Sequence, residues 1–271
     1  MNRTSSPIRA IPAILALLVF AGGTPAEVLA QREARDDEYA VNDVRVQHRS
    51  YVMEETGETI PYALFVPSGY DPSTPSPLMV SLHGAGRQFD WLMNYAGFLD
   101  LADQHGYVVV TPLGYTRRGG YGYRGDSEQD RRAEQDVMNV LAIAQDRYSI
   151  DKSRIYLRGH SMGGAGTYHL AATHPDLWAA LGVAAPAPSV DPDQLEAFKH
   201  VPIIVMQGDE DRLVTTTREW VAKMKAIGME HLYVEVKGGD HSRFINANAD
   251  TLEKIFAFFN IVRKDQRPQT N

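Results

Sequence analysis

The stretch from Arg154 to Gly166, RIYLRGHSMGGAG, constrains the fold of this chain more than any other. An apolar run at 155–157 precedes the pattern Gly-x-Ser-x-Gly at 159–163, and a helical pattern follows it. This order predicts a strand, a sharp turn and a helix, with the hydroxyl of Ser161 exposed at the turn. Glycine on either side of the serine avoids steric conflict in so strained a turn. The helix N-terminus would then direct free N–H groups toward the same point.

The pattern alone is weak evidence, since it arises by chance in roughly one chain in ten of this length. Its surroundings strengthen it, because continuous apolar runs recur and predict strands buried on both faces. These runs are 78–82, 107–110, 155–157, 181–184, 203–206 and 231–236. Helical patterns lie between them at 90–105, 127–148 (or from 130), 162–174, 215–227 and 249–262. The alternation predicts an α/β fold with a doubly wound, mostly parallel sheet.

The segment ahead of these elements has a different pattern. Residues 41–53 and 59–66 alternate polar and apolar side chains around a turn at 55–58, which predicts an antiparallel hairpin at a sheet edge. We find no internal repeat and no second domain. A single domain is therefore expected over 41–264, followed by a polar tail at 265–271.

A serine hydroxyl is a poor nucleophile until a neighbouring base removes its proton, and that base needs an acid to orient it. Candidates for both roles follow predicted strands: the segment QGDED (207–211) follows one, and His241 follows the last. Carboxyl ends of parallel strands meet at one edge of a sheet, so these side chains can converge. Ser161 is the expected nucleophile and His241 the expected base, with Asp211 or Asp209 as the acid.

Together these motifs resemble the α/β-hydrolase superfamily. The resemblance runs from about residue 64 to residue 262 and rests on 159–164, on a His-Gly loop at 83–86 and on the two polar strand ends. Further stretches resemble one branch, which holds exported feruloyl and acetylxylan esterases, polyhydroxybutyrate depolymerases and prolyl-oligopeptidase-like hydrolase domains. The stretches that resemble this branch are Glu134–Val137, Arg154–Leu157 and His174–Ala179. The chain has no cysteine, so it lacks the disulfides of some esterases in that branch.

The resemblance favours one of the two aspartates. Gly208, Asp211 and Val214 match the family pattern Gly-x-x-Asp-x-x-Val, which favours Asp211 as the acid that orients the base. Asp209 is then expected to cap or brace its loop.

The resemblance also implies an oxyanion hole, which acyl transfer needs to stabilise the tetrahedral intermediate. One expected donor is the backbone N–H of Met162, next to the nucleophile. The second is expected from the His-Gly loop, with Ala85 preferred and Gly86 as the alternative. His83 is expected to brace this loop rather than to act as a second base.

The longest unassigned loop near the strand ends, 112–127, is rich in aromatic and basic residues. Aromatic rings stack on aryl or sugar rings, and arginine binds carboxylates. The candidate substrate-binding residues are Tyr115, Tyr121, Tyr123 and Arg124, with Arg117 and Arg118 beside them. The alternative is a mobile, glycine-rich surface loop.

The expected cleft is open. The link 185–201 is too short for a large lid, and no propeller-sized segment precedes residue 41. This favours a secreted serine ester hydrolase that forms an acyl-enzyme on a large or polymeric substrate, of feruloyl/acetyl-polysaccharide or polyester type. The alternatives are an exported serine peptidase of the prolyl-oligopeptidase-like type and a non-catalytic binding module.

The other histidines do not suggest a metal site. His160 is expected to pack beneath the turn, whereas His105, His169, His174 and His231 have no metal-like spacing. We expect neither a metal nor a cofactor.

The N-terminus predicts export. Arg3 and Arg9 precede the apolar run 10–21, and small residues end the segment at Ala30, as in a secretory signal peptide over 1–30. An uncleaved anchor is the alternative, and 31–40 is expected to be a solvated leader. A net charge of −7 without a basic run argues against nucleic acid as a partner. The expected location is secreted or periplasmic, with no stable membrane span after processing.

Overall fold

The computed structural model describes residues 39–187 and 191–267. The predicted signal peptide and residues 31–38 of the predicted leader lie outside the described residues. Within the ranges that the structure describes, no helix combines the length and apolar character needed to cross a bilayer.

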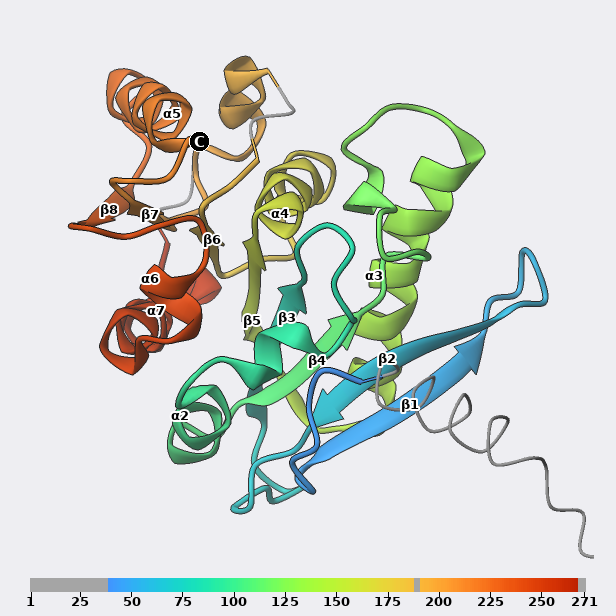
Figure 1. The fold of residues 1–271 in the computed structure, drawn as a ribbon. Coiled ribbons are helices and arrows are strands. Elements are labelled where there is room, and N and C mark those ends of the chain that lie inside the picture. The colour runs from blue at the N-terminus through green and yellow to red at the C-terminus, as the bar shows by residue number, and fades with distance from the viewer. Residues whose placement is uncertain (1–38, 188–190, 268–271) are drawn as a thin grey trace, which may run out of the picture. The chain divides into compact units, whose positions relative to one another are not determined.

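One eight-stranded sheet runs through the described part of the chain, in the order β1-β2-β4-β3-β5-β6-β7-β8 (Figure 1). The strands are β1 (Val46–Val52), β2 (Thr59–Phe65), β3 (Ser76–Leu82), β4 (Val108–Pro112), β5 (Ile150–His160), β6 (Ala180–Ala184), β7 (Ile203–Gly208) and β8 (His231–Val236). Strands β3 to β8 pair in parallel, whereas β1 and β2 form an antiparallel hairpin that joins β4. The predicted sheet and its edge hairpin are confirmed.

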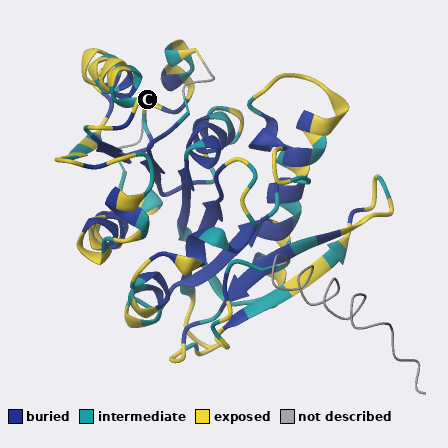
Figure 2. Cartoon of the chain, in the orientation of Figure 1, coloured by how far each residue is buried: buried dark blue, intermediate teal, exposed yellow. Residues whose placement is uncertain are grey.

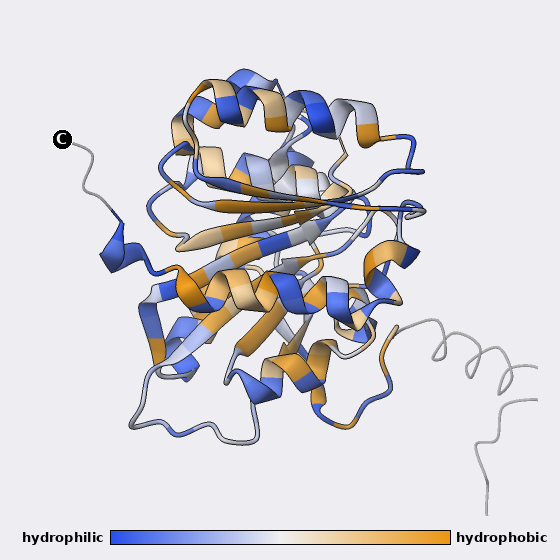
Figure 3. Ribbon diagram, turned by 90° about the vertical axis from the view of Figure 1, so that its left-hand side faces the viewer, coloured by the Kyte–Doolittle hydropathy of each residue, from blue (hydrophilic) through white to orange (hydrophobic). Residues whose placement is uncertain are grey.

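Helices cover both faces of the sheet (Figure 1). One layer contains α2 (Phe98–Gln104), α6 (Arg243–Asn246) and α7 (Ala249–Ile261), and the other contains α3 (Glu128–Arg147), α4 (Met162–Thr173) and α5 (Val214–Ala226). Successive strand residues point to opposite layers, so Met79 packs in the first core and Val80 in the second. Figures 2 and 3 show these buried, apolar strands between the two layers.

Short 3₁₀ segments complete the fold: η1 (Trp91–Asn94), η2 (Gly120–Gly122), η3 (Pro192–Phe198) and η4 (Lys264–Gln266). The prediction of one helix over 90–105 was wrong, because η1 and α2 are separate. Tyr95 is extended and Gly97 has φ 77°, a left-handed conformation that glycine adopts at little cost. The break turns Trp91 and Tyr95 toward the sheet, where both contact His160.

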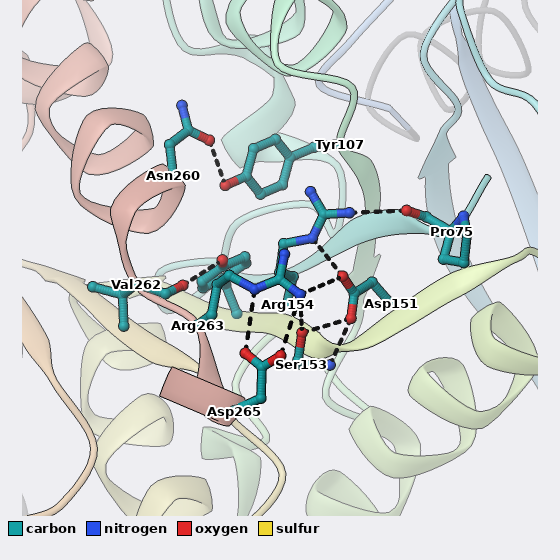
Figure 4. A network of polar contacts seen from close by, with 10 residues as sticks. Pro75, Tyr107, Asp151, Ser153, Arg154, Asn260, Val262, Arg263 and Asp265 are labelled. Carbon is teal, nitrogen blue, oxygen red and sulfur yellow. Dashed lines mark hydrogen bonds and ion pairs between the residues drawn. The ribbon is translucent and has the colours of Figure 1, made fainter. Parts of the chain in front are cut away.

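The start of β5 is tied to the C-terminal segment by a polar network (Figure 4). The Asp151 carboxylate accepts hydrogen bonds from Arg154 at 2.7 Å and from Arg263 at 3.3 Å. Arg267 donates to the carbonyl of Trp178 at 2.6 Å. Residues 265–267 of the predicted tail thus include one side chain that contacts the segment before β6.

Candidate active site

Ser161 lies at the bend between β5 and α4, with φ 56° and ψ −114°. Such a conformation costs a non-glycine residue about 1–3 kcal/mol and persists only where the surroundings impose it. The N–H of Ser161 donates to the carbonyl of Ala184 at 2.9 Å, and its carbonyl accepts from the N–H of Ala187 at 3.0 Å. Strand β6 and the segment after it therefore hold the strained turn.

The glycines around Ser161 are required by close backbone packing. A Cβ atom on Gly159 would lie 2.0 Å from the carbonyl oxygen of Gly163, and one on Gly163 would lie 2.0 Å from that of Leu82. Both contacts are far inside van der Waals distance and involve backbone, which cannot move aside. The Gly-x-Ser-x-Gly pattern thus has the steric cause that the sequence predicts.

His241 follows β8 and lies between Ser161 and Asp211. Its Nε2 is 2.9 Å from Ser161 Oγ, and its Nδ1 is 2.8 Å from Asp211 Oδ2. The carboxylate can only accept, so Nδ1 carries the proton and Nε2 is free to accept the serine proton. The side chain of His241 is 35% exposed, whereas that of Asp211 is completely buried.

The Asp211 carboxylate is held on several sides. Gln207 Nε2 donates to Oδ2 at 2.8 Å, and the N–H of Leu213 donates to Oδ1 at 3.1 Å. Burial alone would raise the pKa of Asp211, but hydrogen bonds from His241 and Gln207 outweigh it and hold that pKa below its usual value. Thr217 in turn donates to Gln207 Oε1 at 2.8 Å. Sequence reasoning missed Gln207, although a polar residue at the end of an apolar strand is a usable signal.

The neighbouring aspartates have other partners. Asp209 Oδ1 accepts from the N–H of Gly238 at 2.6 Å and so braces the β7 loop against the β8 loop. Asp240 Oδ1 accepts from the N–H of Ser242 at 2.9 Å. Of the aspartates considered, Asp211 is the one that the structure places against the imidazole.

His160 supports the site from below, as the sequence predicts. It is fully buried, and its Nε2 lies 2.8 Å from the carbonyl of His241, to which it must donate. Its Nδ1 therefore accepts the short hydrogen bond from the Tyr95 hydroxyl, while the Trp91 ring stacks on it at 5.2 Å. Burial lowers the pKa of His160 to about 3, so it stays neutral in this tautomer. Sequence reasoning missed Tyr95 and Trp91.

The His-Gly loop passes directly beside the serine. A Cβ atom on Gly84 would lie 3.6 Å from the Cβ of Ser161. His83 is buried, with Nε2 2.8 Å from the carbonyl of Leu113 and Nδ1 2.8 Å from that of Gly84. Burial lowers the pKa of His83. These contacts brace the loop and give His83 no contact with the serine.

The two expected oxyanion donors remain free for a ligand. The N–H of Gly86 donates to the carbonyl of Arg117 at 2.7 Å, which removes the alternative donor. The N–H of Ala85 has no acceptor within the described ranges. Met162 is the first residue of α4, so its N–H has no carbonyl one turn earlier in the helix.

The four candidate substrate-binding residues do not all lie beside Ser161. The prediction for Tyr121 was wrong, because its ring is fully buried and its hydroxyl donates to the carbonyl of His83 at 3.2 Å. It supports the His-Gly loop from inside. A Cβ atom on Gly166 would lie 2.6 Å from the Tyr121 ring, so α4 needs glycine there.

Tyr115 contacts the edge hairpin and α3. Its hydroxyl donates to Glu58 in the hairpin turn and accepts from Arg132 of α3 at 3.3 Å. Its contacts give no support to a substrate-binding role.

Tyr123 and Arg124 do lie beside the site. Arg124 Nη2 is 3.8 Å from Met162 Sδ, and Nε is 3.4 Å from the Tyr123 hydroxyl. The loop therefore brings part of the predicted set to the residue that follows Ser161.

Among the described residues, no group of three or more histidine, cysteine, aspartate or glutamate side chains is arranged to hold a metal ion. Two histidines that looked scattered in the sequence share one partner. His169 and His174 each place Nε2 2.7 Å from the Glu134 carboxylate. The hydrogen bond from His169 lowers the pKa of Glu134. This cluster links α3 to α4 and the segment after it.

Comparison with protein families matches residues 92–268 to a family described as PET hydrolase-like. Among curated proteins, the chain is 34% identical over 151 residues to the bifunctional acetylxylan esterase/xylanase XynS20E of Neocallimastix patriciarum, covering 55% of this chain and 21% of that protein. It is 30% identical over 145 residues to cutinase 2 of Thermobifida cellulosilytica, covering 51% and 50%. It thus spans half or less of these relatives.

Solved structures show the same architecture. A ferulic acid esterase from Anaeromyces mucronatus superposes with a TM-score of 0.60 at 19% identity, covering 83% of this chain and 94% of that one. A thermostable esterase gives 0.62 at 25% identity, covering 81% and 63%. The predicted α/β-hydrolase fold and its relation to the feruloyl and acetylxylan esterase branch are confirmed. Cutinases are relatives that the sequence motifs did not suggest.

Proposed function

The chain belongs to the PET hydrolase-like family, and from this premise we propose that it is a serine carboxylic-ester hydrolase that forms an acyl-enzyme on Ser161. The observation that carries the proposal is the continuous chain of hydrogen bonds from Ser161 through His241 to Asp211, at 2.9 and 2.8 Å. The relatives' names, which include acetylxylan esterase, feruloyl esterase and cutinase, support an ester substrate.

The geometry supports the following steps. His241 Nε2 takes the proton of Ser161 as Oγ attacks the ester carbonyl carbon, and the N–H groups of Met162 and Ala85 stabilise the resulting oxyanion. The alcohol leaves with the proton held by His241, which gives an acyl-Ser161 ester. Water then gives a proton to His241 and attacks the acyl carbon, which releases the acid and restores the serine. Asp211 keeps the imidazole oriented and stabilises its charged form.

We propose that the substrate is large or polymeric, of feruloyl/acetyl-polysaccharide or polyester type. Two observations support easy access of such a substrate to Ser161. The His241 side chain is 35% exposed, and the helical segment in the described part of the link after β6 is the short η3. A panel of feruloyl, acetylated-sugar, short-chain and polyester substrates ranks the types by kcat/KM.

Fluorophosphonate labelling and matched substrates test the reaction type. We expect one label per chain on Ser161, none in Ser161→Ala, and faster cleavage of p-nitrophenyl acetate than of p-nitroacetanilide. An unlabelled wild-type serine would exclude the mechanism. Preference for the amide would favour the peptidase, and labelling without turnover of any ester or amide would favour a binding module.

We further propose that the enzyme is exported by a signal peptide over 1–30, supported by Arg3, Arg9 and the apolar run after them. N-terminal sequencing of protein secreted by a bacterial host is expected to begin at Gln31. A product that retains Met1 in the membrane fraction would indicate an anchor.

A further inference from the structure

Three exposed arginines converge on the surroundings of Ser161. Arg124 reaches the residue after the serine, with Nη2 3.8 Å from Met162 Sδ. Arg118 lies over the oxyanion loop, since a Cβ atom on Gly86 would be 3.3 Å from its Nη2. Both arginines come from the loop between β4 and α3.

The third arginine lies on the other end of the oxyanion loop. The Cζ of Arg87 is 4.9 Å from the centroid of the Trp91 ring. A Cβ atom on Gly84 would lie 3.5 Å from Cζ3 of that ring and 3.6 Å from the Cβ of Ser161. Trp91 therefore borders the serine, and Arg87 covers Trp91.

None of these three guanidinium groups has an ion-pair partner within the described residues. Other arginines do: Arg154 pairs with Asp151, and Arg218 pairs with Glu235. Two acids of the β7 loop have other partners. Asp211 is buried against His241, and Asp209 accepts from the backbone of the β8 loop.

A chain of net charge −7 thus places around Ser161 three arginines that lack an ion-pair partner among the described residues. Such a local field attracts an anion and raises its concentration in the cleft. A guanidinium group matches a carboxylate through two parallel hydrogen bonds. The Tyr123 ring, which lies under Arg124, suits an aryl group beside the charge.

From this placement, and building on the proposed esterase function, we propose that Arg87, Arg118 and Arg124 select esters that carry a free carboxylate near the scissile bond, such as half-esters of aromatic dicarboxylic acids. The carboxylate belongs to the acyl part or to the alcohol part of the ester, and both share the same recognition by arginine.

Matched substrates test this selection on both sides of the ester. On the acyl side, methyl 4-carboxybenzoate is compared with methyl 4-nitrobenzoate, because nitro is a neutral group of the same shape. On the alcohol side, 4-carboxyphenyl acetate is compared with 4-nitrophenyl acetate. Arg87→Gln, Arg118→Gln and Arg124→Gln, singly and together, are measured against Arg49→Gln. Arg49 lies on the edge strand β1 and donates to Gln47.

We expect the ratio of kcat/KM for the carboxylate ester to that for the nitro ester to fall about tenfold for at least one single variant, and further for the triple variant. The side of the ester on which the ratio falls identifies the part that carries the charge. Arg49→Gln is expected to keep the wild-type ratio. Unchanged ratios on both sides in the triple variant would overturn the proposal while leaving the esterase intact, whereas failure of wild type to cleave any of the four esters would count against the esterase itself.

A second measurement uses the wild-type enzyme alone. Terephthalate is expected to inhibit hydrolysis of 4-nitrophenyl acetate competitively and at least about tenfold more tightly than terephthalamide, its neutral analogue. Added NaCl is expected to weaken inhibition by terephthalate only. Equal inhibition by both compounds would contradict selection of anions by the three arginines. This measurement does not depend on the stability of the variants.

Discussion

The two ends of strand β5 differ sharply in how they use polar groups. At its start, Asp151 and Arg154 are paired with each other and with the C-terminal segment through Arg263 (Figure 4). At its end, Ser161 has a strained backbone, and Arg87, Arg118 and Arg124 have no carboxylate partner among the described residues. One end satisfies its charges within the chain, while the other leaves strain and charge available to a ligand. Stability and reactivity are thus separated along a single strand.

The largest effect should come from removing the serine at the reactive end. Ser161→Ala is expected to lower kcat/KM for p-nitrophenyl acetate by roughly 10⁴-fold or more. Thermal unfolding should stay within a few degrees of wild type. Ser153→Ala, near the start of the same strand, is the matched control and should retain full activity. Comparable activity in both variants would abolish the contrast between the two ends.

Replacing each of the two aspartates after β7 by asparagine should show which one orients the His241 imidazole and which one braces the loop. Asp211→Asn is expected to lower kcat by about 10³–10⁴-fold, because the imidazole loses the acceptor that sets its tautomer. Asp209→Asn is expected to cost less than about tenfold, since it holds a loop by one backbone hydrogen bond. Steady-state kinetics with one ester decides the matter. A larger loss in Asp209→Asn would reverse the assignment of the acid.

A smaller effect on kcat is expected from Tyr95, which lies beneath the site. Tyr95→Phe removes the donor that fixes His160, which in turn holds the backbone of His241. We expect kcat to fall about tenfold with little change in KM, because a slight displacement of the base affects the chemical step. Tyr107→Phe is the control at the other end of the sheet, where the hydroxyl donates to Asn260. A change in KM alone would indicate that Tyr95 acts on substrate binding.

The paired charges at the start of β5 should affect stability but not activity. Burial would raise the pKa of Asp151, but hydrogen bonds from Ser153 and Arg154 outweigh it and lower that pKa from 3.8 to about 2. Because the folded-state pKa is depressed, its stabilisation is present above pH 3.8 and is lost as the pH falls toward 2.

Asp151→Asn is therefore expected to lower the free energy of unfolding by about 1 kcal/mol at pH 7. The difference from wild type should vanish near pH 2, while kcat/KM at pH 7 stays unchanged. Urea unfolding at several pH values measures this. A stability difference that grows on acidification would contradict the linkage.

Much of this molecule follows from local patterns that the sequence displays. Continuous apolar runs predict buried parallel strands because residues in such strands have no solvent-facing side. The contact of 2.0 Å at Gly159 shows why the turn requires glycine. The Gly-x-Ser-x-Gly turn, the chain order and the positions after predicted strands together identified Ser161 and His241 as residues that meet. The prediction of one helix over 90–105 was wrong because Gly97 interrupts it. The glycine was a local signal for this break, but the prediction followed the apolar pattern instead.

The sequence by itself determined the fold class, the strained serine turn and the set of residues that follow each strand. Only the tertiary structure decided between Asp209 and Asp211, buried Tyr121 beneath the oxyanion loop, and placed Gln207 against Asp211 and Tyr95 against His160. The reason is physical: strand and turn patterns depend on neighbours in the chain, whereas burial, hydrogen-bond partners and unpaired charge depend on groups brought together from distant elements.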